Sequence, residues 1–169
     1  MKANESILLK KTKTWTTVNI VLLIIGTVIS IFSMISLMSM RASGYAMFRG
    51  LPGGEEMIDL LEQSISPVSI AITVILIAVN IALVVWFFKC NGRMKQNIVP
   101  EKLPYYINVG LFLLNQIYSL VSGGTQNNVS SGIIITVVLA LVFLWIRIMP
   151  LVHLRRITTK PGEQIQEIE

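Results

Sequence analysis

The fold is decided by an uncharged stretch, PVSIAITVILIAVNIALVVWFF, which occupies residues 67–88. An α-helix rises about 1.5 Å per residue, so this stretch would reach about 33 Å, enough to cross the hydrocarbon core of a bilayer. Acidic residues precede it and basic residues follow it, namely Glu55, Glu56, Asp59 and Glu62 before and Lys89, Arg93 and Lys95 after. The sequence therefore predicts a membrane-spanning helix whose two ends differ in charge.

Three further apolar runs lie at residues 15–40, 104–121 and 132–149, and Pro150 is expected to end or kink the helix of the last run. The chain has 169 residues, of which 53% are hydrophobic and only 14% are charged, whereas a soluble domain is usually about 25% charged. Only helices and closed barrels satisfy the backbone inside lipid, and these runs lack the alternation of barrel strands. We therefore expect an all-α integral membrane protein, a single domain over residues 1–169, whose four antiparallel spans form an up-down four-helix bundle.

Lysine and arginine residues lie almost entirely on one side of the predicted spans. That side holds Lys2, Lys10, Lys11, Lys13, Lys89, Arg93, Lys95, Lys102, Arg147, Arg155, Arg156 and Lys160, and the other holds Arg41 and Arg49. Because the basic side faces the cytoplasm, an even number of spans places both termini there. The rings of Trp15, Trp86, Trp145, Tyr105 and Tyr106 fall at the same ends, where the interface favours them. The short loops favour a multi-pass protein of the bacterial cytoplasmic membrane.

Small and polar residues recur at helical spacing along each predicted span. Lipid supplies no hydrophobic drive for helix association, so such residues are expected to mark the faces on which helices pack. The first span carries the small-residue stripe Asn19, Gly26, Ser30 and Ser33. The members nearest the basic ends of the four spans form a predicted polar cluster of Asn19, Asn80, Asn108 and Arg147. This cluster either holds the helices together or lines a pocket for an anionic headgroup or ligand; alternatively, Arg147 only extends to the lipid headgroups.

The first extracellular loop is expected to contain a short amphipathic helix over residues 55–65. Pro52, Gly53 and Gly54 are a turn signal, and the two glutamates that follow complement the dipole of a helix start. The candidate partner face of this helix consists of Met57, Leu60, Leu61, Ile65, Glu56, Asp59 and Glu62. Such a helix lies on the membrane surface, caps the bundle or binds an extracellular partner. We expect Leu61 and Ile65 to be buried against lipid or the bundle and Glu62 to be exposed.

No motif in the chain predicts a chemistry. All nine aspartate and glutamate residues lie outside the predicted spans, which argues against a proton- or cation-coupled carrier. One histidine and one cysteine without a buried acid do not provide a nucleophile–base pair or a metal site. We therefore expect no catalytic residue, no metal, no cofactor and no enzyme activity. The net charge of +5 flanks apolar runs without interleaved aromatic residues, which argues against nucleic acid as a partner.

Three functional hypotheses remain open at this point. The first is an accessory, assembly or immunity-type interaction subunit of a larger membrane complex, whose partners are the lipid bilayer and another membrane protein or further copies of the chain. It rests on the lack of a catalytic constellation and of a coupling carboxylate. The second is a small carrier or channel that uses the polar stripes as a pathway. The third is a lipid-binding membrane protein that uses the polar cluster.

Overall fold

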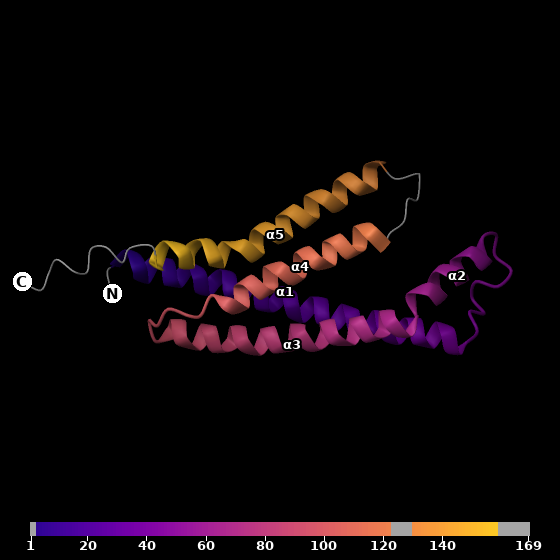
Figure 1. Ribbon diagram of the computed structural model, residues 1–169, viewed down its shortest axis with the longest axis horizontal. Coiled ribbons are helices and arrows are strands. Elements are labelled where there is room, and N and C mark those ends of the chain that lie inside the picture. Colours follow the sequence, from indigo (N-terminus) through magenta and orange to yellow (C-terminus); the bar gives the residue numbers. More distant parts are fainter. Residues whose placement is uncertain (1–2, 123–129, 159–169) are drawn as a thin grey trace, which may run out of the picture. The chain divides into compact units, whose positions relative to one another are not determined.

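The computed structural model describes residues 3–122 and 130–158, which form helices joined by turns, with no strand among them (Figure 1). The helices are α1 (Ala3–Ala42), α2 (Gly54–Ser64), α3 (Pro67–Lys95), α4 (Leu103–Ser122) and α5 (Ser130–Thr158). In the described part, three segments are long and apolar enough to cross a membrane: Asn4–Ala42, Pro67–Lys95 and Val137–Ile157. The all-α prediction is confirmed, and the three candidate spans indicate a multi-pass membrane protein.

The helix α4 covers the predicted third span but is not among these three candidate spans of the described residues. Its 20 residues would extend about 30 Å, so its length is sufficient. Asn108, Asn115 and Gln116 interrupt its apolar run. Length and composition therefore support three spans directly and leave the fourth to be tested.

The start of α3 follows from its first residues. The Oγ of Ser66 accepts a hydrogen bond from the backbone N–H of Ser69 at 3.2 Å. Ser66 thus occupies the N-cap position, and Pro67 occupies the first helical position, where its missing N–H costs nothing. The predicted start of this helix at Pro67 is confirmed.

The end of α3 lies beyond the apolar run, at Lys95 rather than Phe88. Asn97 adopts a left-handed conformation with φ of 59°. The backbone N–H of Ile98 donates to the carbonyl of Arg93 at 3.0 Å, and that of Asn97 donates to Met94 at 3.2 Å. These two bonds form a Schellman motif, which ends the helix without leaving its last carbonyls unpaired.

Two other helices also extend beyond the predicted spans on their basic sides. The helix α1 begins at Ala3 rather than near Trp15. Its first turns bury Leu9 and Thr12, so packing stabilises a segment that reads as a polar tail. The helix α5 continues through Pro150 to Thr158. A proline was expected to end or kink this helix, and its continuation requires a partner for the backbone carbonyl that the proline leaves free.

The chain divides into two compact units. The first unit comprises Met1–Ile20 and Val85–Glu169, and therefore the start of α1, the end of α3, α4 and α5. Within it α4 and α5 run antiparallel as neighbours (Figure 1). Phe87, Tyr105 and Leu154 are fully buried, and the ring centroids of Phe87 and Tyr105 lie 5.0 Å apart. These side chains form the core of the first unit.

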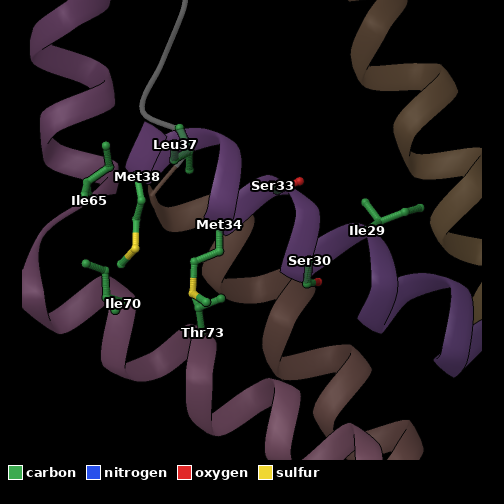
Figure 2. Close-up of a pocket in the computed structure, with 9 residues that line it drawn as sticks. All are labelled: Ile29, Ser30, Ser33, Met34, Leu37, Met38, Ile65, Ile70 and Thr73. Carbon is green, nitrogen blue, oxygen red and sulfur yellow. The ribbon is translucent and has the colours of Figure 1, made fainter. Parts of the chain in front are cut away.

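The second unit, Val21–Val84, contains the rest of α1, α2 and the start of α3. An apolar groove of about 240 Å³ lies between α1 and α3. Figure 2 shows Met38 of α1 between Ile65 and Ile70, and Met34 reaching toward Thr73 of α3. The methionines therefore line the space between the two helices, where flexible side chains adapt to irregular gaps.

The short amphipathic helix predicted for residues 55–65 is confirmed as α2. Ile65, directly after it, is buried as expected, and Glu62 is exposed. Leu61 is partly buried. The turn before α2 depends on Gly54, because a Cβ atom at this position would lie 2.1 Å from the carbonyl oxygen of Phe48.

We expect Gly54→Ala to destabilise the second unit, because the backbone of Phe48 must move to admit the methyl group. The cost should be roughly 1–3 kcal/mol, and thermal unfolding of the purified protein in detergent should show a fall in Tm of roughly 5 °C. Gly92→Ala in α3 is the matched control, since a Cβ there meets nothing within 4 Å and alanine favours a helix. An equal loss in both variants would contradict the role given to Gly54.

Candidate functional site

Polar side chains of α1, α4 and α5 meet inside the first unit. Asn19 and Asn108 are each only 1% exposed. The Nδ2 of Asn108 donates to Oδ1 of Asn19 at 3.0 Å. Nη1 of Arg147 in turn donates to Oδ1 of Asn108. This Asn–Asn–Arg chain, formed by Asn19, Asn108 and Arg147, joins three of the four residues of the predicted polar cluster.

The first member of the chain meets the backbone that Pro150 disrupts. Proline has no N–H, so in α5 the carbonyl of Ile146, four residues earlier, lacks its usual helical donor. Nδ2 of Asn19 donates to this carbonyl at 3.2 Å. Inside lipid an unpaired carbonyl is costly, and a side chain from a neighbouring helix is one way in which membrane helices tolerate proline. Asn19 thus explains how α5 continues through Pro150.

The hydrogen-bonding capacity of Asn19 is used within the first unit. One hydrogen of its Nδ2 goes to Ile146, and the other goes to the carbonyl of Trp15 at 2.9 Å. Its Oδ1 accepts from Asn108. The opposite orientation of the Asn19 amide would place its oxygen against two carbonyls, so the direction of the Asn–Asn–Arg chain follows from the backbone.

The last member of the chain is a cation within a candidate span. Arg147 is partly exposed, and its guanidinium carbon lies 4.8 Å from the ring centroid of Phe112. Its Nε is buried without a hydrogen-bond partner, and within residues 3–122 and 130–158 no carboxylate pairs with it. An arginine at the centre of a membrane helix costs about 2.5–3.5 kcal/mol on insertion scales. The stacking of Arg147 on Phe112 and its hydrogen bond to the side-chain amide of Asn108 offset only part of such a cost.

A second hydrogen bond between helices was not anticipated from the sequence. The hydroxyl of Thr16 donates to its own helix at the carbonyl of Thr12, at 2.8 Å. Its single proton is then used, so the hydroxyl of Tyr105, 2.9 Å away, donates to Thr16. Tyr105 was assigned to the membrane interface, but it is fully buried between α1 and α4. The burial of Tyr105 could have been anticipated only from the buried face of α1, which carries Thr16 and Asn19.

Asn80, the fourth residue of the predicted cluster, lies in the second unit and is partly exposed. It takes no part in the Asn–Asn–Arg chain. The expectation that polar stripes point inward holds only for part of α1: Asn19 is buried, whereas Gly26 and Ser33 are exposed. Further along α1 the buried positions are Leu23 and Thr27 instead.

The candidate partner face of α2 lies largely outside the core of its unit. Met57 and Leu60 are 51% and 53% exposed. The acidic members of the face, Glu56, Asp59 and Glu62, are exposed as well. An apolar strip bordered by acids thus remains on the surface of the second unit.

The described residues offer little chemistry beyond hydrogen bonding and charge. No three side chains of the His, Cys, Asp or Glu type lie close enough there to hold a metal ion. The ion pair between Arg93 and Glu101, at 2.7 Å, is half exposed and contributes little. Comparison with protein-family models, with curated proteins and with solved structures found no match. The arrangement is suited to joining helices and to presenting one cation within the span.

The link between Asn19 and Pro150 can be measured with a double-mutant cycle. Asn19→Ala should destabilise the protein by about 1–3 kcal/mol, because it leaves the Ile146 carbonyl and the Asn108 amide without partners. In a Pro150→Ala background the helix supplies its own donor to Ile146, so the same substitution should cost about 1 kcal/mol less. Thermal unfolding in detergent, followed by tryptophan fluorescence, gives each value.

Asn115→Ala is the control for this cycle, because Asn115 lies exposed on α4. It should change the Tm little in either background. Strictly additive effects of Asn19→Ala and Pro150→Ala would show that Asn19 does not serve the carbonyl freed by the proline.

Proposed function

We propose that the protein is a non-enzymatic interaction subunit, an accessory, assembly or immunity-type component of a larger membrane complex. The support comes from the contrast between the two units. In the first, polar groups of three helices bond to each other. In the second, faces suited to a protein partner remain uncovered.

The observation that carries this proposal is the exposed small-residue face of α1. Gly26 and Ser33 are exposed, and a Cβ atom at Gly26 would meet nothing within 4 Å. Ser30, between them, bonds its hydroxyl to the carbonyl of Gly26 at 2.9 Å, so it does not require water. Small residues at such spacing let two membrane helices approach closely. A helix of a partner subunit would gain packing here that lipid chains do not supply.

The exposed strip of α2 supports the same proposal from outside the span. Met57 and Leu60 lie near Glu56 and Asp59, so a partner with an apolar contact surface and a basic rim would match them. Both surfaces belong to the second unit. One partner can therefore engage both.

The carrier or channel hypothesis finds less support in these contacts. A pathway needs polar groups that exchange partners with a passing solute. Asn19 has committed both donor hydrogens, and Thr27, Ser30 and Thr73 bond to carbonyls of their own helices. These groups stabilise helices and leave little for a substrate.

The proposal includes a four-span bundle with both termini in the cytoplasm, in the cytoplasmic membrane of a bacterium. The charge asymmetry supports it, since the ends of α3 and α5 carry Arg93, Lys95, Arg155 and Arg156. If α4 did not cross, the ends of α3 and α5 would lie on opposite sides. Topology therefore tests the number of spans.

Single cysteines on a Cys90→Ser background should report this topology. We expect a membrane-impermeant thiol reagent added to intact cells to label Met47→Cys and to leave Lys95→Cys and Arg156→Cys unlabelled. All three positions are exposed, so protection reports the side of the membrane. Labelling at 156 without labelling at 95 would show three spans, and labelling at 95 would reverse the orientation.

Photo-crosslinking from α1 should reveal the partner. A benzophenone amino acid at Ser33 should give a discrete protein adduct in native membranes, whereas at Val28, on the opposite face of α1, it should react mainly with lipid. Gly26→Leu should reduce the Ser33 adduct several-fold by filling the close-approach face, and Val28→Leu should not. Equal crosslinking from both positions would contradict a partner on this face.

A further inference from the structure

We propose that Arg147 pairs with a carboxylate on a transmembrane helix of a different protein. This inference rests on the proposed function and specifies the chemistry of the partner. Arg147 is partly exposed within a candidate span, has an unpaired buried Nε, and has no carboxylate partner among the described residues. Such a cation is stabilised strongly by an acid in the same low-dielectric environment.

The direction of the side chain argues against a lipid phosphate as the anion. The guanidinium lies between Asn108 and Phe112 of α4. These residues follow Lys102, which directly precedes α4, by six and ten positions, which places them about 9 Å and about 15 Å along the helix axis. A headgroup phosphate belongs at the basic end, so the arginine points away from it.

The Asn–Asn–Arg chain keeps the arginine in this direction. Asn108 turns its oxygen toward Arg147 because its amide nitrogen donates to Asn19, and Asn19 is held by the carbonyls of Ile146 and Trp15. Stacking on Phe112 restricts the guanidinium from one side. The donors of Arg147 are thus arranged before a partner arrives, which lowers the entropic cost of binding.

A second copy of this chain does not supply the missing acid. The nine acidic residues are Glu5, Glu55, Glu56, Asp59, Glu62, Glu101, Glu163, Glu167 and Glu169. None belongs to the apolar runs at residues 15–40, 67–88, 104–121 and 132–149. A carboxylate at the depth of Arg147 must therefore come from another protein, so charge complementarity favours a hetero-oligomer over a homo-oligomer.

The surroundings of Arg147 on α5 suit a helical partner. Phe143, one turn earlier on the same face, is 38% exposed, and Leu113 of α4 is 42% exposed. A partner helix that presents one Asp or Glu among apolar residues would pack on these side chains and reach the guanidinium. The contact is then a buried ion pair surrounded by apolar packing.

The test uses a defined probe in place of the unidentified partner. Purified full-length protein is reconstituted in phosphatidylcholine vesicles with a labelled 21-residue Leu-rich transmembrane peptide that carries one central Asp, or Asn or Leu at the same position. We expect energy transfer to show about tenfold stronger association of the Asp peptide than of the Leu peptide, with Asn intermediate. No preference for Asp in the wild-type protein overturns the proposal.

Charge variants assign the preference to Arg147. R147Q should abolish it and R147K should reduce it several-fold, whereas Arg93→Gln, which removes a half-exposed charge already paired with Glu101, should leave it unchanged. If R147Q fails to fold, R147K decides: an unchanged preference shows that the guanidinium is not the contact. Loss of the preference in Arg93→Gln would assign it to net charge and overturn the proposal.

A lipid titration distinguishes a phosphate partner of Arg147 from a carboxylate partner. Phosphatidylglycerol and inorganic phosphate are titrated separately into the detergent-solubilised protein, and the Tm is followed. A rise in Tm that depends on Arg147, without a preference for the Asp peptide, would replace the carboxylate by a phosphate. A Ser33 adduct without a preference for the Asp peptide would leave the interaction-subunit proposal standing and reject only the role of Arg147. The reverse result would keep the carboxylate contact and reject the α1 face.

Discussion

The backbone carbonyl of Ile146 is the constraint on which the first unit depends. Pro150 deprives it of a donor inside a helix apolar enough to cross a membrane, where water does not substitute. Asn19 of α1 provides the bond. This places α1 beside α5 at a defined level, and the edge-to-face contact of Trp15 with Trp145, at 5.2 Å, packs next to it. A local defect in one helix thereby determines which residues of another helix it meets.

The consequences of that bond extend through the polar chain to the charge. Because both donor hydrogens of Asn19 are used on carbonyls, its oxygen faces Asn108, and the oxygen of Asn108 faces Arg147. Each amide oxygen accepts a hydrogen bond from the next side chain, as the groups of a buried polar network require. The chain ends on a cation without a described acid partner, so hydrogen bonding within the Asn–Asn–Arg chain is incomplete only at Arg147. The incomplete end is also the part that is accessible.

The two units differ in how their polar, aromatic and small residues are placed. The first unit places aromatic and polar groups in its interior, with Tyr105 and Phe87 fully buried. The second unit has a groove lined in part by methionine side chains and by Ser30 and Ser33, and Gly26 and Ser33 of the small-residue stripe of α1 remain exposed. In lipid, helices associate through packing of small residues and through hydrogen bonds, so an uncovered face of this kind is more informative than exposed isoleucine or leucine. The proposed role as an interaction subunit follows from this difference.

The sequence by itself determined the helices, their apolar spans and the existence of α2, because these depend on composition and on neighbours a few positions away. It also grouped Asn19, Asn80, Asn108 and Arg147 near the basic ends of the spans, although Asn80 takes no part in the Asn–Asn–Arg chain. Only the tertiary structure decided their partners, since the bonds of Asn19 to Ile146 and to Asn108 join residues 127 and 89 positions apart. Helical periodicity shows which residues share a face, but the neighbouring helix decides whether that face is covered. For that reason Gly26 and Ser33 are exposed, Tyr105 is buried, and Arg147 contacts Asn108 and Phe112 of α4.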